Sequence, residues 1–371
     1  MILLIMFIVL VIANMVFPRN KLLTGISFIY MWVLMGWSYG NADYEFYVLR
    51  YKSTATYYTL EPLYVILQNI AKSFEFQYST FLILMSFIFL LIRFFVILKF
   101  TDKPNYVISL WMLYPFIMDI VQIRQFYATT IVMLGIYFLF ASKKLGSVKF
   151  VICVMLATLI HSSNLVYMLL LVPYLWDFSI KKFKRVIFLM VIVSITMLRT
   201  GLLKILGQNV ATMLGFGVKF RETFIAANRQ YSLNNLYYYV FQIVVLFILC
   251  EFVFRKIDCI KSDIVINNGI NSMKFIEWAE KSNWILLLVI PLVWFSGDIY
   301  RIQHGFLTIV YIVASLMTRN KGLVIKKSYL LGKIAMCLTA LLFFYWVLLY
   351  VPGLRETTFI PAFYNNRLFM N

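Results

Sequence analysis

Three polar side chains flank two apolar runs in the stretch 119–164, and their types could carry chemistry together. Arg124 and Gln125 begin the first run, a Lys-Lys turn at 143–144 separates the runs, and His161 closes the second. An imidazole exchanges protons near neutral pH, and a guanidinium binds phosphate oxygens through a planar fork of donors. If the lysine turn lies in the cytoplasm, the runs form a helical hairpin whose open end carries Arg124, Gln125 and His161 on the other side of the membrane.

The lengths of the two runs place these groups at similar depth. At about 1.5 Å of rise per residue, the helix from Phe140 back to Arg124 measures about 24 Å, and the helix from Val148 to His161 about 20 Å. Both fall short of a hydrocarbon core of about 30 Å, so both polar ends lie below the outer surface. Ionisable groups at that depth are a functional-site hypothesis, because they are costly unless they face protein or a water-filled cavity. The alternative is that Arg124 snorkels and His161 is a hydrogen-bonded helix end.

The elements that must hold these groups are membrane helices. Hydrophobic residues make up 63% of the chain and the mean hydropathy is +0.87, which is typical of a polytopic helical membrane protein. We expect an all-α fold with about twelve transmembrane helices and an outward-facing polar cavity, in a single membrane domain, 1–371. The first run has no basic residues before it and no cleavage signature, which predicts a retained span rather than a signal peptide. The expected spans are 2–17, 22–39, 78–98, 105–121, 124–141, 148–161, 164–177, 186–200, 235–254, 284–298, 302–318 and 329–351, with both termini outside.

One part of this topology has two solutions. The residues 148–177 are one long tilted helix or two short helices broken at His161. Lys149 and the basic cluster at 181–185 both favour the cytoplasm, and a single crossing would put one of them outside. The charges therefore favour two short helices.

The distribution of the basic residues that give the net charge of +19 fits the same topology. Of the 34 Lys and Arg residues, 21 lie on the loops assigned to the cytoplasm, against six acidic residues there. This positive-inside pattern explains the basic balance without a nucleic-acid partner. The four cysteines have no CxxC or metal-ligand spacing, so we expect neither a structural disulfide nor a metal site.

The first external segment, about 40–77, carries two candidate features. Asp43, Tyr44 and Tyr47 share a face if the loop is helical. Such acidic and aromatic residues suit a carbohydrate site, but they equally suit a membrane interface, which this loop alone favours. Glu61 precedes Pro62 at the start of an amphipathic helix that we expect in the outer interface before a span begins near 78. Glu61 either stabilises that helix start or faces the cavity.

Positive charge recurs in the later external segments. The longest, about 201–234, contains Arg221 and Arg229 with only one acidic residue, Glu222. Positive charge on an external loop runs against the positive-inside rule. It therefore indicates either an anionic ligand such as a pyrophosphate or a basic loop on anionic lipid headgroups. Arg301 lies in a tight turn, where it pairs with Asp298 or His304 or points into the same cavity as Arg124. In the external tail, about 352–371, we expect packing over the outer face by three side chains: Arg355, Tyr364 and Arg367.

Familiar catalytic signatures are missing from the sequence. It contains no HExxH, no P-loop, no GxSxG and no DxD-type carboxylate pair. A metal-dependent enzyme that uses nucleotide sugars in the cytoplasm is therefore disfavoured. Nucleotide sugars are not available outside, so a reaction there needs substrates activated beforehand, and lipid-pyrophosphate sugars are such substrates.

The order of the short motifs resembles one family. The chain is similar to the EpsG family of Wzy-type polysaccharide polymerases over most of its length, most strongly across 43–173, and its tail beyond 351 matches only loosely. The motifs that carry the resemblance are Asp43-Tyr44, Glu61-Pro62-Leu63-Tyr64, Arg124-Gln125 with Ala128, His161-Ser162-Ser163 and the turn at Arg301.

The resemblance implies a reaction at the outer leaflet of a bacterial cell membrane. A growing glycan would pass from its polyprenyl-pyrophosphate carrier to the next lipid-linked repeat unit, in capsule or exopolysaccharide biosynthesis, without metal or cofactor. Implied partners are the lipid-linked oligosaccharides, membrane lipids, a chain-length regulator and a flippase. On this basis His161 is the candidate base and Arg124 stabilises the leaving pyrophosphate. Expected substrate-binding residues are Gln125, Asp43, Tyr44, Glu61, Arg221, Arg229 and Arg301.

Two other function classes share these features. A lipid-linked glycan flippase or exporter would have the same spans and basic cavity, but it is expected to show pseudo-symmetric halves, which the sequence does not. A glycan ligase or a polyprenyl-phosphate-dependent glycosyltransferase differs from a polymerase only in the donor and acceptor that it uses.

Overall fold

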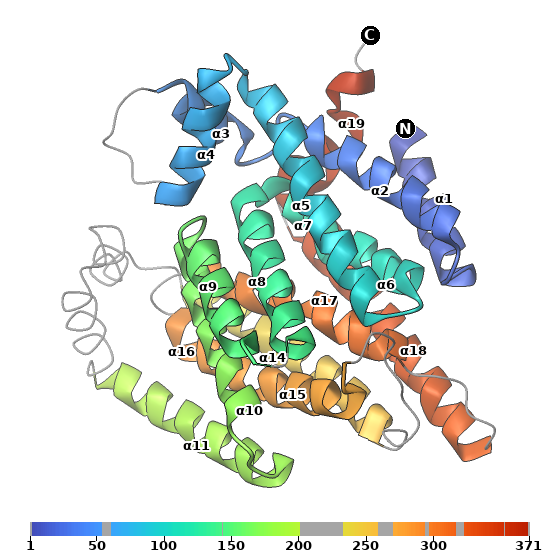
Figure 1. Ribbon diagram of the computed structural model, residues 1–371, viewed down its shortest axis with the longest axis vertical. Coiled ribbons are helices and arrows are strands. Elements are labelled where there is room, and N and C mark those ends of the chain that lie inside the picture. The colour runs from blue at the N-terminus through green and yellow to red at the C-terminus, as the bar shows by residue number, and fades with distance from the viewer. Residues whose placement is uncertain are drawn as a thin grey trace.

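The computed structural model describes most of the chain as helix. The described residues are 2–53, 61–142, 144–200, 233–258, 270–293, 297–316, 323–351 and 353–369. Within these ranges the expected all-α fold is confirmed, because they contain no strand longer than the isolated bridge between Ser38 and Asn366. Both termini lie at one end of the molecule, the same end as α3 (Tyr44–Lys52) and α4 (Pro62–Ser73) (Figure 1).

The expected number of about twelve spans is not confirmed. Five described helical stretches are long and apolar enough to cross a membrane: Tyr78–Phe100, Pro104–Val121, Ile123–Ala141, Tyr237–Lys256 and Leu330–Tyr350. Several other expected spans form shorter apolar helices of 10–17 residues, among them α1 (Ile2–Val16) and α2 (Lys21–Gly36). Hydropathy marks apolar segments, but it does not determine how long each helix runs before the chain turns.

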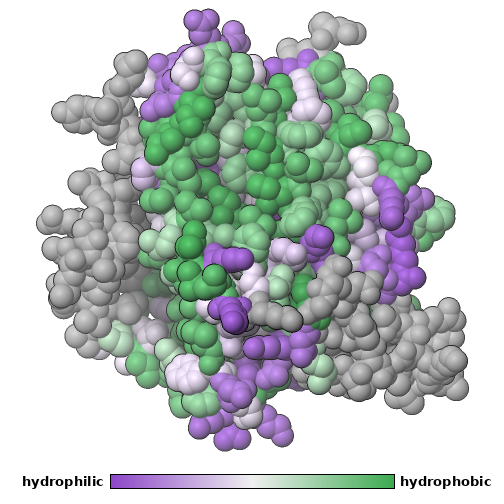
Figure 2. All heavy atoms as spheres, in the orientation of Figure 1, coloured by the Kyte–Doolittle hydropathy of each residue, from purple (hydrophilic) through white to green (hydrophobic). Residues whose placement is uncertain are grey.

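Apolar side chains are exposed on the surface of the described helices. Figure 2 shows hydrophobic side chains over the central part of one face, with hydrophilic groups at its upper and lower ends and at its right edge. On α1, Ile5, Val9 and Ile12 are each about half exposed, at 52–57%. Continuous apolar exposure of this kind is unfavourable in water and suits contact with lipid.

The centre of the molecule is built around α8 (Ile123–Ala141), which packs against α9 (Gly146–Thr158) and α5 (Tyr78–Phe100). The α8–α9 hairpin is the one expected from the sequence. Its helices approach closely at Gly135, where an added Cβ would lie 2.8 Å from the Cβ of Cys153. Glycine therefore sets the spacing of the hairpin.

Helical geometry is interrupted just before α8 and just after α9, and these two interruptions shape the site. Before α8, the chain passes through α6 (Pro104–Trp111), a kinked segment η1 (Met112–Phe116) with a cis Tyr114–Pro115 bond, and α7 (Ile117–Val121). Within η1, Tyr114 is extended, with φ −161° and ψ 129°. Gln122 then leaves helical geometry, with φ −88° and ψ 51°.

After α9, His161 is extended, with φ −152° and ψ 110°. The chain then continues as the 3₁₀ helix η2 (Ser162–Leu171) and α10 (Val172–Leu175). The two short helices favoured for 148–177, broken at His161, are confirmed.

One expected loop is a helix instead. From the sequence, the residues before the expected span 284–298 are a cytoplasmic loop that includes Lys274, Glu277, Glu280 and Lys281. The prediction of a loop here is wrong. The helix α15 (Ser272–Ile285) contains all four and continues into η5 (Leu286–Val289) and α16 (Ile290–Val293).

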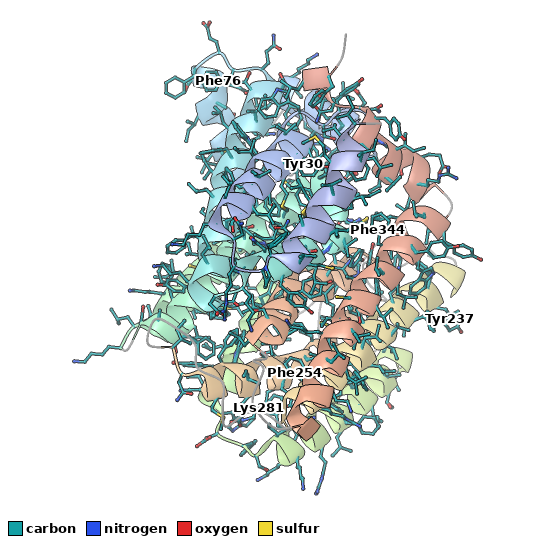
Figure 3. The ribbon with its side chains drawn as sticks, turned by 90° about the vertical axis from the view of Figure 1, so that its right-hand side faces the viewer. Tyr30, Phe76, Tyr237, Phe254, Lys281 and Phe344 are labelled. Carbon is teal, nitrogen blue, oxygen red and sulfur yellow. The ribbon has the colours of Figure 1, made fainter. Side chains whose placement is uncertain are left out.

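Three of these four charges are accommodated because they pair. Lys184 on α11 (Ile180–Arg199) lies 2.8 Å from Glu280, which is fully buried, and 2.5 Å from Glu251 on α14 (Leu233–Asp258). Lys281 pairs with Glu277 at 2.8 Å. Helix α15 begins at an Asn271 cap, whose side chain accepts from the backbone of Lys274. Figure 3 shows Lys281 near the lower end of the molecule.

The last elements close the fold. They are η6 (Gly297–Tyr300), α17 (Arg301–Leu316), α18 (Leu323–Phe343), η7 (Phe344–Tyr350), η8 (Arg355–Phe359), α19 (Ile360–Tyr364) and η9 (Arg367–Phe369). Helix α17 packs against α6, and its Gly305 has no room for a side chain, because an added Cβ would lie 2.3 Å from the Tyr167 hydroxyl and 2.8 Å from Thr129 Cγ2. The Tyr167 hydroxyl is itself held by the backbone oxygen of Ile302 at 2.6 Å.

The tail packs against the segment between α2 and α3. Backbone bonds join Tyr39 to Asn365 and Arg367 to Trp37, and the Arg367 guanidinium lies 5.0 Å from the Tyr44 ring centroid. Of the three tail side chains expected to pack over the outer face, Arg367 lies over the Tyr39 and Tyr44 rings. The side chains of Arg355 and Tyr364 are exposed.

Candidate active site

Arg124 lies in the first turn of α8 and is held by two partners. Its Nη1 donates to Glu61 Oε2 at 2.6 Å, and its Nε donates to the Tyr47 hydroxyl at 3.2 Å. The Arg124 and Glu61 side chains are only 11% and 7% exposed, so this ion pair is largely removed from solvent. The guanidinium also lies over the Tyr47 and Tyr64 rings, 5.3 and 5.8 Å from their centroids. These contacts hold the guanidinium in one orientation and leave Nη2 unused by either bond.

Glu61 connects α8 to the break after α9. Its Oε1 accepts from both the backbone N–H and the hydroxyl of Ser162, each at 3.2 Å. Next to it, the backbone N–H of Leu63 donates to the backbone oxygen of Leu159 at 2.9 Å. Within α4, the Glu61 side chain makes no capping bond to its own helix. Its carboxylate therefore joins the beginnings of α4, α8 and η2, three segments far apart in the sequence.

His161 takes part in a neighbouring hydrogen-bond network. Its Nδ1 lies 2.9 Å from Ser163 Oγ, which lies 3.3 Å from Gln125 Oε1. Asn164 Nδ2 donates to the same Gln125 oxygen at 3.1 Å. An amide oxygen only accepts, so the Ser163 hydroxyl donates its single proton to Gln125 and accepts from Nδ1–H of His161. This assignment leaves the lone pair of the neutral imidazole on Nε2, which is the atom able to take a proton.

The structure thus brings Arg124, Gln125, Glu61 and His161 to one place. Ser162 and Ser163 are consecutive, and one bonds Glu61 while the other bonds His161 and Gln125. The open end of the hairpin therefore contains both a guanidinium and an imidazole.

A cavity of about 600 Å³ lies beside this centre. Its polar lining includes Asp43, Gln122 and Arg301, and Gln122 is two residues before Arg124 in the chain. Most of the remaining lining is aromatic and apolar. Neither Arg124 nor His161 is a lining residue, so the cavity and the ion-pair centre are neighbouring but distinct.

Tyr47 interacts both with the ion-pair centre, through its bond to Arg124, and with two residues of the cavity lining, through the charges of Asp43 and Arg301. Burial raises the pKa of Tyr47 above its usual range. The positive charges of Arg124 and Arg301 oppose this rise, and the negative charge of Asp43 adds to it. Its hydroxyl therefore stays protonated and can donate a hydrogen bond while it accepts one from Arg124.

The remaining expected site residues lie elsewhere. Tyr44 lines a second hollow of about 480 Å³ together with Tyr51, Tyr78, Lys52 and Arg367. Arg221 and Arg229 lie outside the described residues.

Sequence reasoning missed several parts of this region. It did not identify Gln122 or the aromatic lining, because rings in apolar runs look the same whether they face lipid or a cavity. It also missed Arg93, which is fully buried in α5, contacts the sulfur of Met133 and lies 5.2 Å from the Trp111 ring centroid. A lone arginine within an apolar span was the available signal.

The fold and this centre define a helical membrane protein with a buried arginine–glutamate pair and a histidine beside an aromatic cavity. The EpsG family matches residues 21–363, nearly the whole chain. The chain belongs to the EpsG family, which is the Wzy-type polymerase-like family. No curated protein and no solved structure matches the chain. Membership indicates a polysaccharide polymerase-like role in a membrane.

Proposed function

We propose that the protein is a polysaccharide polymerase that acts at the outer leaflet of the cell membrane. It transfers a growing glycan from a polyprenyl-pyrophosphate carrier to the next lipid-linked repeat unit, as a metal-independent glycosyltransferase of the Wzy type. The observation that supports this most directly is the meeting of Arg124, Glu61 and His161 at the open end of the α8–α9 hairpin.

The reaction forms one glycosidic bond and breaks one bond to phosphate. The acceptor hydroxyl oxygen attacks the anomeric carbon of the donor glycan, and the bond from that carbon to the pyrophosphate oxygen breaks. The proton of the attacking hydroxyl passes to His161 Nε2, whose orientation is fixed by the Ser163 bond. Polyprenyl pyrophosphate leaves as the anion.

Arg124 stabilises the charge that develops on the leaving pyrophosphate. The contacts to Glu61 and Tyr47 use two of its five N–H donors, so three remain for phosphate oxygens. A preoriented guanidinium in a site of low water content stabilises such charge more strongly than one in water. Asp43, Gln125 and Arg301 position sugar hydroxyls in this scheme. Glu61 acts indirectly, because its carboxylate holds Arg124.

The proposal is tested with purified protein in detergent and lipid-linked repeat units from the producing strain. A polymerase makes a ladder of longer chains, whereas a flippase or exporter, in the absence of compartments, leaves the substrate length unchanged. We expect Arg124→Ala and His161→Ala each to lower the rate of chain extension by at least about 100-fold.

A matched control is Arg19→Ala. It removes an arginine of similar size whose side chain is 65% exposed and pairs with Asp102. This variant should make the wild-type ladder. Wild-type ladders from Arg124→Ala and His161→Ala, at equal protein level, would overturn the assignment of these residues.

A further inference from the structure

The cavity beside the ion-pair centre has an aromatic wall from three distant parts of the chain. Tyr238 and Tyr239 come from α14, Tyr300 from η6, and Trp346 and Tyr350 from η7. The polar groups Asp43, Gln122 and Arg301 complete what we call the aromatic cavity. Its volume of about 600 Å³ falls in the range of about 300–1,000 Å³ typical of small-molecule sites.

The rings of this wall are held in place by one another. Tyr239 stacks on Tyr300 with centroids 4.6 Å apart and planes 19° from parallel. Tyr238 meets Trp346 edge to face at 5.6 Å and 75°. Behind the wall, Tyr300 packs on the edge of His304 at 4.9 Å, and His304 is in turn within 3.0 Å of the Tyr114 hydroxyl. Rings supported in this way form a binding surface before a ligand arrives.

The combination of groups selects a class of ligand. A pyranose sugar has apolar C–H faces, which suit aromatic rings, and a rim of hydroxyls, which both donate and accept. The carboxylate of Asp43 accepts from hydroxyls, the guanidinium of Arg301 donates to them, and the Gln122 amide does both. A bare pyrophosphate fits less well, because the acidic Asp43 shares the cavity with Arg301. A hydrocarbon tail fits less well, because it would place apolar CH₂ groups against the charged side chains of Asp43 and Arg301.

We propose that the aromatic cavity binds the non-reducing sugar of the acceptor repeat unit. This inference rests on the proposed polymerase function and adds which substrate occupies which part of the site. Gln122 lies in the cavity lining two residues before Arg124, so a sugar in the cavity lies beside the centre that receives the donor pyrophosphate. The acceptor hydroxyl then approaches the donor from the cavity side.

The test uses an acceptor that cannot donate. An octyl glycoside of the repeat unit, prepared from the strain's own polysaccharide, has the acceptor sugar but no pyrophosphate leaving group. Purified protein is given a fixed lipid-linked donor, and transfer to increasing concentrations of the octyl glycoside yields its KM and kcat. Direct binding of the same octyl glycoside is measured separately by calorimetry.

Two tyrosines on α14 provide a matched pair of variants. Tyr239 lines the aromatic cavity, whereas Tyr237 is 67% exposed and projects away from the molecule (Figure 3). Tyr239→Ala should raise both the KM and the Kd for the octyl glycoside about tenfold, which is a loss of about 1.4 kcal/mol in binding free energy. The KM for the lipid-linked donor should stay within twofold of the wild-type value. Tyr237→Ala should leave all of these constants unchanged.

The outcomes separate this inference from the proposed function. If Tyr239→Ala and Trp346→Ala bind and use the octyl glycoside like wild type, while Arg124→Ala makes no polymer, the sugar site is wrong and the polymerase stands. If a Tyr239→Ala effect falls equally on donor and acceptor, the assignment to the acceptor is wrong. If wild-type protein makes no polymer and yet binds the octyl glycoside with Tyr239 dependence, the polymerase proposal fails and the sugar site remains.

Discussion

The ion pair between Arg124 and Glu61 makes a quantitative prediction about stability. Glu61→Ala removes the carboxylate that accepts from Arg124 Nη1 at 2.6 Å and from two donors of Ser162 at 3.2 Å. The guanidinium that remains is almost fully enclosed and keeps only the Tyr47 hydroxyl among these partners. The variant therefore contains a buried cation without its counter-ion.

The size of the effect follows from this burial. Removing one partner of a buried pair costs about 3–5 kcal/mol. The entropy of unfolding is about 2.1 cal/mol/K per residue, so for 371 residues 1 kcal/mol corresponds to about 1.3 °C in Tm. Glu61→Ala should then lower Tm by about 4–6 °C. Arg124→Ala should lower it comparably, because it leaves the Glu61 carboxylate buried.

The assay is a double-variant cycle of thermal unfolding in detergent. In Glu61→Ala/Arg124→Ala neither charge is left alone, so the loss should be smaller than the sum of the single losses by about 1–3 kcal/mol. The control cycle removes Asp102 and Arg19, whose pair is exposed at 39% and 65% and is worth less than about 1 kcal/mol. Its Tm values should stay within about 1 °C of wild type. Strictly additive losses at Glu61 and Arg124 would refute the argument that the two side chains are energetically coupled.

Three further predictions concern positions outside the site. Burial lowers the pKa of Lys103 to about 8, so between pH 8 and about 10.4 this side chain binds more protons in the unfolded chain than in the folded one, and its own contribution to stability should rise with pH, by up to about 3 kcal/mol. The Tm difference between wild type and Lys103→Met should therefore shift in favour of wild type from pH 8 to 10, and a difference that does not change with pH would contradict this. Gly305→Ala should lower the free energy of unfolding by about 1–3 kcal/mol, because the added methyl group clashes with Tyr167. The control Gly25→Ala has nothing within 4 Å of its added Cβ and should raise that free energy by about 0.5–1 kcal/mol. Equal Tm values for the two variants would refute the packing argument. Lys184→Met leaves two carboxylates without their shared cation and should cost about 3 kcal/mol; a Tm equal to wild type would show that this pairing is not stabilising.

Several parts of the candidate centre were within reach of the sequence. Helical rise and the lysine turn predicted that Arg124 and His161 end their helices at the same side, and Pro62 marked the helix start that carries Glu61. The amphipathic helix before the span at 78 was also predicted, and it is α4. These inferences depend on local rules, because rise per residue and helix signals act over a few residues.

Other parts depended on contacts that local rules do not contain. The sequence left open whether Glu61 stabilises the start of its own helix or faces the cavity. In the structure it does neither and instead pairs with Arg124 and accepts hydrogen bonds from Ser162. The charged helix α15 was expected as a loop because Glu280 and Lys281 are polar, and only their pairing makes burial favourable.

The sequence by itself determined that this is an all-helical membrane protein and which hairpin carries its polar ends, because hydropathy and helical period are properties of short segments. Only the tertiary structure decided that Glu61 holds Arg124, that Ser163 links His161 to Gln125, and that rings from α14, η6 and η7 form a cavity beside them. The physical reason is that such contacts join residues up to about 300 positions apart, and their energies depend on burial, which no local pattern contains.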